Sequence, residues 1–357
     1  MTEPLIIDAH LDLAMNALEW NRDLTRPIAE IRAAESGLKD KPGRGGGTVC
    51  LPEMRRGGIG LAVVTQIAKV KTSGFNPGSV WQSPEQAWAM TQGQLAWYRA
   101  LEEAGEIRFV SSRETLAQHL AAWENGKSNA IGCILSLEGA DSLITLKHLE
   151  RAYGYGLRAV GPSHYGPGIY AGGTDSTGGF TARGRELLAE MQRLGMILDV
   201  THLTDEGFWE ALKIYSGPIW ASHHNCRALT PHQRQLSDDQ IRALIERDAV
   251  IGAALDGWML VPDWIRGKTT PESRGLRLES VVEHVDHICQ IAGNSRHVGL
   301  GSDLDGGFGK EQSPSDMETI ADVRRLPELI RQRGGSEDDA RNFAHGNFLR
   351  FLRLALS

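Results

Sequence analysis

The sequence predicts an α/β protein whose parallel strands close into a (β/α)8 barrel of the TIM type. Short apolar runs rich in Val, Ile and Leu recur eight times along the 357 residues. Continuous runs of this kind are typical of parallel strands that are buried on both faces. Stretches with helical periodicity separate the runs. Because eight strands alternating with helices favour closure of the sheet, a barrel is the expected architecture.

The candidate strands are spread over the whole chain. They are Leu5–Ala9, Ile59–Val64, Ala130–Leu137, Leu157–Pro162, Met196–Val200, Pro218–Ser222, Val250–Leu255 and His297–Ser302. A ninth run, Ile107–Val110, is interpreted as an extra edge segment. No linker or internal repeat divides the chain, and the glycine-rich stretches 41–47 and 166–179 are interpreted as loops on the barrel rim. We therefore expect one barrel domain over residues 1–357.

Amphipathic stretches between the strands predict helices. They are Ser83–Ala104, Arg183–Leu194, Asp205–Ile214, Asp238–Arg247 and Leu278–Ala292. Ser83, Thr204 and Ser237 are candidate N-caps, because a side-chain oxygen at that position can accept a hydrogen bond from the first helical turn.

The composition excludes several classes of function. Lys and Arg number 38 against 45 Asp and Glu, so the net charge is −7. Without a basic stripe, nucleic acid is not an expected partner. No apolar run reaches the roughly 18 residues that span a bilayer, so no membrane partner is expected. The chain begins without a secretory signal and its four cysteines lie far apart, which predicts a cytoplasmic protein with free thiols.

Ionisable side chains follow six of the eight candidate strands at their carboxyl ends, the face on which barrel enzymes carry their active sites. Each residue taken alone has an ordinary explanation as a helix cap or a turn former. Their coincidence on one predicted face favours a functional site. These residues are Asp8, His10, Asp12, Glu138, His164, His202, His223, His224, Asp303 and Asp305.

The residue types in this set predict a metal site. His10 and Asp12 are two residues apart, so on a strand they point to the same face and can hold one cation. His202 and His223 follow neighbouring strands and suggest a second site, and the two oxygens of Glu138 could bridge both. Imidazole and carboxylate ligands suit zinc best, although manganese, cobalt or iron also fit. Two such ions would polarise a carbonyl and hold a hydroxide between them, which predicts acyl hydrolysis.

Several sequence motifs resemble those of the membrane dipeptidase (renal dipeptidase) family, peptidase family M19 of the amidohydrolase superfamily. They occur in the family's order over nearly the whole chain. The motifs are Asp8-Ala-His10-Leu-Asp12, Leu51-Pro-Glu-Met-Arg-Arg-Gly-Gly58, Leu137-Glu138-Gly139, Leu198-Asp-Val-Thr-His202, Ser222-His223, Arg234-Gln-Leu-Ser-Asp-Asp239, Gly299-Leu-Gly-Ser-Asp303-Leu-Asp305-Gly306 and Gly346-Asn-Phe-Leu-Arg350.

The resemblance implies a role for each matching residue. Two zinc ions per chain would be bridged by Glu138 and a hydroxide, and the remaining ligands would be His10 and Asp12 for one ion and His202 and His223 for the other. His164 would steady the oxyanion of the tetrahedral intermediate, and Asp303 would carry a proton from the attacking water to the leaving amine. Arg234 would pair with the substrate's terminal carboxylate, a role that suits its planar guanidinium.

The expected activity is therefore hydrolysis of free dipeptides with an L-residue first and an L- or D-residue second. One alternative is another reaction on the same metal platform, such as lactone or N-acyl amino acid hydrolysis or deamination, because the fold alone does not separate these reactions. A second alternative is a catalytically silent binding protein, although the retention of every ligand and of Asp303 argues against it. Homodimers are common in the family, so a homodimer is a further possibility.

Three segments depart from the family pattern. Residues 64–69 lack the family's aromatic residues, His224 stands where a small residue is usual, and the loop at 165–179 is unusually rich in glycine. The disulfides and lipid-anchor signal of the extracellular members do not occur here. We expect these departures to affect substrate preference and not the metal chemistry.

Overall fold

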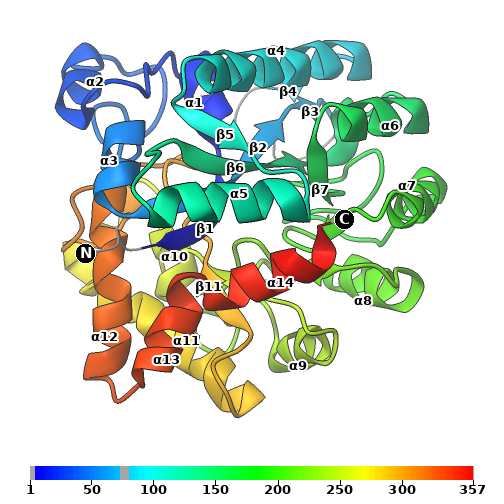
Figure 1. Ribbon diagram of the computed structural model, residues 1–357. Coiled ribbons are helices and arrows are strands. Elements are labelled where there is room, and N and C mark those ends of the chain that lie inside the picture. Colours follow the sequence, from blue (N-terminus) through cyan, green and yellow to red (C-terminus); the bar gives the residue numbers. More distant parts are fainter. Residues whose placement is uncertain (1–4, 73–79, 357) are drawn as a thin grey trace.

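Eight parallel strands form a nearly closed barrel in the computed structural model, which describes residues 5–72 and 80–356 (Figure 1). The strands follow the order β10-β11-β1-β2-β6-β7-β8-β9, and a parallel bridge between Ala221, just after β9, and Ile251 of β10 brings the two ends together. The predicted TIM-type barrel is thus confirmed. The barrel strands are β1 (Ile6–Leu11), β2 (Ile59–Ile67), β6 (Ile131–Glu138), β7 (Leu157–Gly161), β8 (Ile197–Asp199), β9 (Ile219–Trp220), β10 (Ile251–Ala253) and β11 (Val298–Leu300).

Helices surround the barrel (Figure 1). All five predicted helices are present, with boundaries within one residue of those expected, and Ser83, Thr204 and Ser237 each accept a hydrogen bond from a first-turn N–H. The helices are α1 (Leu13–Glu19), α2 (Ile28–Ala34), α3 (Leu51–Arg56), α4 (Pro84–Glu103), α5 (Arg113–Glu124), α6 (Leu146–Gly154), α7 (Ala182–Arg193), α8 (Asp205–Ile214), α9 (Asp238–Glu246), α10 (Gly257–Leu260), α11 (Leu278–Ala292), α12 (Leu326–Gln332), α13 (Glu337–Arg341) and α14 (Asn347–Ala355).

The strands differ in length from the apolar runs that predicted them. β2 continues to Ile67, beyond the expected end at Val64, whereas β8 to β11 have only two or three residues each. The apolar run at 107–110 forms β5 (Ile107–Phe109), which pairs beside the start of β6. The expected extra segment is therefore present. Two further short strands, β3 (Lys69–Val70) and β4 (Val80–Trp81), pair with each other outside the barrel.

The last helix, α14, covers the amino-terminal end of the barrel. The Trp220 ring of β9 lies 6.2 Å from the ring of Phe348 and 5.6 Å from that of Phe351. Asn347 donates side-chain hydrogen bonds to the carbonyls of Ser295 and Val298 at the start of β11. Because apolar packing fills this end of the barrel, the opposite end is the one that can hold a site.

The four cysteines are free thiols, as expected, and three of them are buried. In the part of the chain that the structure describes, no helix combines the length and the apolar character needed to cross a membrane.

Candidate metal centre and active site

The residues that the sequence marks as a site meet at the carboxyl end of the strands. The chain order separates them by almost three hundred positions, but parallel strands place their carboxyl ends at one rim of the barrel. Glu138 ends β6 and His10 lies near the end of β1, while the other members follow their strands within a few residues. Those members are Asp12 after β1, His164 after β7, His202 after β8, His223 after β9 and Asp303 after β11.

The carboxylate of Glu138 lies between two groups of side chains. Its Oε1 atom is 3.1 Å from His202 Nε2 and 3.5 Å from His223 Nε2, and these two nitrogens are 3.2 Å apart. Its Oε2 atom is 3.6 Å from His10 Nε2. Ligand atoms held at about 2.0–2.2 Å by one tetrahedral zinc ion are about 3.3–3.6 Å apart. The three distances in the group around Oε1 lie within about 0.2 Å of this range, so the group is spaced like the ligands of one metal ion.

A second group surrounds the Nε2 atom of His10. This nitrogen lies 3.8 Å from Asp12 Oδ1 and 3.8 Å from Asp303 Oδ1. It is buried and has no hydrogen-bond partner, although a buried unpaired polar atom costs about 1–3 kcal/mol. A cation among these atoms would remove that cost. Thr65 donates a hydrogen bond to Asp12 Oδ1 and orients the carboxylate. The residues present thus fit two cations with Glu138 between them.

Hydroxyl groups hold the imidazoles in place from their far side. Ser222 Oγ lies 2.9 Å from His223 Nδ1, and Thr174 Oγ1 lies 2.9 Å from His202 Nδ1. A hydrogen bond at Nδ1 turns Nε2 toward the cluster, which is the usual support of a metal-binding histidine. The His202 backbone has a φ of 69°, a left-handed conformation that non-glycine residues rarely adopt and that concentrates at functional sites.

The electrostatics of the cluster favour the metal-binding forms of Glu138, His202 and His223, whereas they favour the protonated form of His10, so that a cation bound there would replace a proton. Burial opposes the charged form of His10, but Glu138 and two aspartates outweigh burial and raise its pKa to about 10. Burial also acts against the charge on Glu138, yet the neighbouring histidines keep its pKa well below the usual range. Burial lowers the pKa of both His202 and His223. An ionised carboxylate and neutral imidazoles are the forms that ligate cations.

His164 lies beside this cluster and is held by the glycine-rich loop. Its ring centroid is 4.6 Å from that of His202, and burial lowers its pKa to about 4, so the imidazole is neutral. The backbone N–H of Thr174 donates to the His164 carbonyl over 2.9 Å. A Cβ atom at Gly173 would lie 1.8 Å from that carbonyl oxygen. The loop therefore packs directly on the site, and only glycine fits at residue 173.

Arg234 is a buried cation, and some of its hydrogen-bond donors have no partner. Its side chain is 2% exposed, and Nη2 donates to the carbonyl of His223 over 2.9 Å. Its Nε and Nη1 atoms have no hydrogen-bond partner. Arg234 lines a small cavity of about 40 Å³ together with Glu138, His164 and Asp303. A planar guanidinium with free donors in such a cavity is suited to bind a carboxylate.

Three further ionisable residues, which the strand-end pattern did not single out, also line this cavity, namely Tyr165, Asp256 and Arg266. Arg266 Nη2 donates to Tyr165 Oη over 3.1 Å and lies 3.9 Å from Asp256 Oδ2. A sequence signal for Asp256 existed, because it follows the seventh candidate strand directly. The rule that applies to the other strand ends therefore also places Asp256 at the site.

Three other strand-end residues support the loops and not the cluster. Asp8 accepts hydrogen bonds from the backbone and side chain of Ser302. Asp305 accepts two from Thr48, at 2.8 Å from its N–H and 2.7 Å from its hydroxyl. His224 is buried, and its Nδ1 lies 3.4 Å from a threonine hydroxyl. The alternative interpretation of Asp305 as a turn residue therefore describes it better.

Replacing Asp256 with Asn is expected to stabilise the protein at alkaline pH. Burial raises the pKa of Asp256 from 3.8 to about 7, so the folded state holds a proton that the unfolded chain releases above about pH 4. Folding thus loses stability as the pH rises from 4 through 7, by roughly 2–4 kcal/mol in total. The D256N variant has no carboxyl group at this position to ionise, so its stability does not fall in this way. Melting temperatures of chelator-treated protein should differ little at pH 4 and diverge by pH 8.

The control for this measurement is Asp263→Asn, which changes an exposed carboxylate. Its melting temperature should follow that of the unmodified protein at both pH values. A D256N protein that melts no later than the unmodified protein at pH 8 would contradict the burial argument.

A parallel barrel that gathers imidazoles and carboxylates at its carboxyl rim defines the class of barrel metallohydrolases. Within that class, the family model described as membrane dipeptidase (peptidase family M19) matches residues 1–356, so the chain belongs to this family. The resemblance seen in the sequence motifs is confirmed. Membership of this family supports a metal-dependent dipeptidase.

Curated relatives include proteins of bacteria and fungi. A protein encoded in the pqqA 5′ region of Klebsiella pneumoniae is 31% identical over 215 residues, covering 58% of this chain and 75% of that protein. An uncharacterized dipeptidase of Schizosaccharomyces pombe is 30% identical over 292 residues, covering 78% of this chain and 64% of that protein. Dipeptidase tcpJ of Claviceps purpurea is 29% identical over 233 residues, covering 62% of this chain and 51% of that protein. The chain thus spans about half to two thirds of these fungal relatives.

Two solved structures share the fold over nearly their full length. A metallopeptidase of family M19, dipeptidase AC, superposes with a TM-score of 0.79 at 24% identity, covering 100% of this chain and 99% of that one. A metallopeptidase from Rhodobacter sphaeroides, crystallised with a phosphinate mimic of the dipeptide L-Ala-D-Ala, gives a TM-score of 0.77 at 23% identity, covering 99% and 100%.

Proposed function

We propose that this protein is a binuclear zinc dipeptidase that hydrolyses the peptide bond of free dipeptides. The observation that carries the proposal is the position of Glu138, whose two oxygens face separate groups of ligand-type atoms 3.1–3.6 Å away. His10 and Asp12 would hold one ion, and His202 and His223 the other. When bound, the two ions would polarise the peptide carbonyl and lower the pKa of the attacking water.

The chain's own residues would position the substrate and move protons. Arg234, with two unpaired donors in the cavity, binds the terminal carboxylate and so sets the scissile bond beside Glu138. Neutral His164 donates an N–H to the carbonyl oxygen as negative charge develops there. Asp303 is largely buried, and this burial together with the neighbouring carboxylates raises its pKa well above the usual range. It can therefore hold the proton from water and pass it to the leaving nitrogen.

The size of the cavity supports dipeptides over longer peptides. The space around Arg234 and Glu138 measures about 40 Å³ and is also lined by Trp258 and Met259. A substrate whose carboxylate reaches Arg234 has room for one residue beyond the scissile bond. The Rhodobacter sphaeroides relative was crystallised with a mimic of L-Ala-D-Ala, which supports an L-residue first and a D-residue accepted second.

Metal analysis and a substrate panel test this proposal together. Protein purified without added metal should contain close to two zinc ions per chain and should hydrolyse L,L- and L,D-dipeptides. A chelator should abolish hydrolysis and zinc should restore it. The panel also includes lactones and N-acyl amino acids, because the latter carry a carboxylate for Arg234 but no free amine. Hydrolysis of those compounds without dipeptide hydrolysis, or protein that binds no metal, would contradict the proposal.

A further inference from the structure

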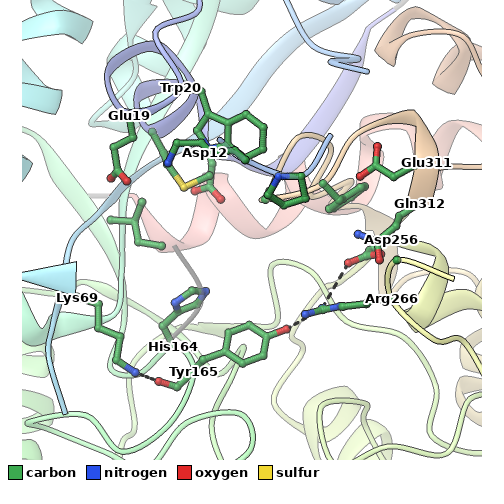
Figure 2. Close-up of a pocket in the computed structure, with 18 of the residues that line it drawn as sticks. Asp12, Glu19, Trp20, Lys69, His164, Tyr165, Asp256, Arg266, Glu311 and Gln312 are labelled. Atoms are coloured by element: carbon green, nitrogen blue, oxygen red, sulfur yellow. Dashed lines mark hydrogen bonds and ion pairs between the residues drawn. The ribbon is translucent and has the colours of Figure 1, made fainter. Parts of the chain in front are cut away.

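A second and larger cavity opens beside the metal-type cluster. It has a volume of about 420 Å³ and is formed by α1 with the residues after it, the end of β2 with β3, and the loop after β11. Of the two cavities, only the small one is lined by Glu138 and Arg234, whereas both are lined by Asp12, His164, Tyr165, Asp256, Arg266 and Gly306. Figure 2 shows Trp20 on one side of the large cavity and His164 and Tyr165 on the opposite side.

The arrangement of the cavities fixes which end of a dipeptide would enter the large one. This step rests on the proposed function, in which Arg234 binds the terminal carboxylate and Glu138 lies at the scissile bond. The carboxylate end then fills the small cavity. The large cavity adjoins the small one at Asp12 and His164, and the other cavity beside Glu138 measures only about 10 Å³, which leaves the large cavity as the one with room for a side chain. The side chain of the amino-terminal residue therefore lies there.

The wall that this side chain would meet is largely apolar. Met15, Trp20, Ile67, Ala68 and Phe308 line the cavity from three different segments of the chain. All except Met15 are buried, and Phe308 is 1% exposed. A volume of about 420 Å³ lies within the range of pockets that enclose small-molecule ligands. A glycine has no side chain to contact this wall, whereas a large apolar side chain would bury much apolar surface against it.

Most of the charged groups at this cavity are engaged with the protein itself. Glu19 and Lys41 line it as well, and Lys41 Nζ lies 5.6 Å from the centroid of the Trp20 ring. Lys69 donates to the backbone carbonyl of Tyr165, and Arg266 donates to the Tyr165 hydroxyl and faces Asp256. Glu311 accepts a hydrogen bond from a backbone N–H over 3.0 Å. A charged substrate side chain would have to displace these bonds to gain a partner. The chemistry of the wall thus selects against charge.

The aromatic wall residue is held rigidly from outside the cavity. The guanidinium carbon of Arg22 lies 4.5 Å from the centroid of the Trp20 ring, and that of Arg44 lies 5.4 Å away. Glu35 accepts hydrogen bonds from both arginines, at 2.8 Å from Arg22 Nε and 2.6 Å from Arg44 Nη1. Because these ions are themselves fixed, the indole is preorganised to contact a ligand.

We propose that the large cavity is a pocket for the amino-terminal side chain and that it selects dipeptides whose first residue is bulky and apolar, either aromatic or branched aliphatic. Met15, Trp20 and Phe308 determine this specificity, while the metal-type cluster performs the reaction on any dipeptide that reaches it.

A set of dipeptides that differ only in the first residue tests the proposal. With D-alanine as the constant second residue, kcat/KM should be at least about 100-fold higher for L-leucine or L-phenylalanine than for glycine, since even one buried methylene is worth about tenfold or more. L-glutamate and L-lysine should fall near glycine. Equal rates for all first residues, or a preference for a charged one, would overturn the pocket assignment. Absence of hydrolysis for the whole set would instead contradict the dipeptidase proposal.

Met15→Trp places a larger side chain into the same pocket. It should lower the leucine-to-glycine ratio of kcat/KM by about tenfold or more, because the space for the first side chain is occupied. Met15→Leu keeps the wall apolar and should retain the ratio, which separates pocket filling from misfolding. Leu18→Trp is the matched control, since Leu18 lies on the same helix but is 42% exposed. An unchanged ratio in a folded M15W protein would overturn the role of this wall.

Discussion

Glu138→Gln should abolish dipeptide hydrolysis, lowering kcat/KM by at least about 1,000-fold. The substitution keeps the size of the side chain but removes its charge and replaces one oxygen with an amide nitrogen that cannot accept a metal. Since Oε1 faces His202 and His223 while Oε2 faces His10, either amide orientation disrupts one group. Because each 1.36 kcal/mol changes the rate tenfold, this decrease in kcat/KM corresponds to a loss of several kcal/mol of transition-state stabilisation.

Metal content distinguishes this explanation from a folding defect. The E138Q protein should bind fewer than two ions per chain, and added zinc should raise its melting temperature less than that of the unmodified protein. Glu283→Gln, which changes an exposed carboxylate on α11, should leave both properties unchanged. A folded E138Q protein that retains two ions and full activity would be incompatible with the bridging role.

Arg234→Ala should lower kcat/KM for dipeptides by roughly 30- to 5,000-fold, mainly through KM. Truncating one partner of a buried, hydrogen-bonded charge pair costs about 2–5 kcal/mol. The physical basis is that Nε and Nη1 are buried without partners in the cavity. Because Arg234 is a buried cation that forms no ion pair within 4.0 Å among the described residues, the same substitution should not reduce the free energy of unfolding and can increase it.

Dipeptide amides provide the control for this substitution. They lack the terminal carboxylate, so the unmodified protein should cleave them slowly, and R234A should cleave them at a similar rate. An equally large loss on the amides would show that Arg234 only supports His223, whose carbonyl it contacts over 2.9 Å.

The sequence predicted most of the barrel because its elements depend on local patterns. The helices with caps at Ser83, Thr204 and Ser237 end within one residue of their predicted boundaries, since an N-cap and an apolar stripe are both local signals. The strands β8 to β11 are shorter than their apolar runs. A buried segment is apolar whether its backbone pairs with the neighbouring strands or forms a loop. The apolar run therefore does not mark where a strand ends.

The topology of the barrel predicted that the polar residues at the strand ends would meet, but it did not predict the direction in which each side chain points. His10, Glu138 and His223 meet because parallel strands end at one rim. The same rule placed Asp305 at that rim, yet its carboxylate binds Thr48 and a buried arginine. Whether a strand-end carboxylate faces the barrel axis or a loop depends on contacts between distant segments, which a single sequence does not contain. Asp256 is a different case, because it directly follows the seventh candidate strand and the strand-end rule places it at the same rim.

The glycine-rich loop has a consequence for how this enzyme can diversify. Gly173 and Thr174 contact His164 and His202 directly, so insertions or substitutions there disturb the reaction centre together with any change in selectivity. The flank that carries Met15 and Trp20 adjoins the cluster at Asp12. Randomised libraries aimed at new substrates should therefore yield far more active clones from that flank than from the glycine-rich loop.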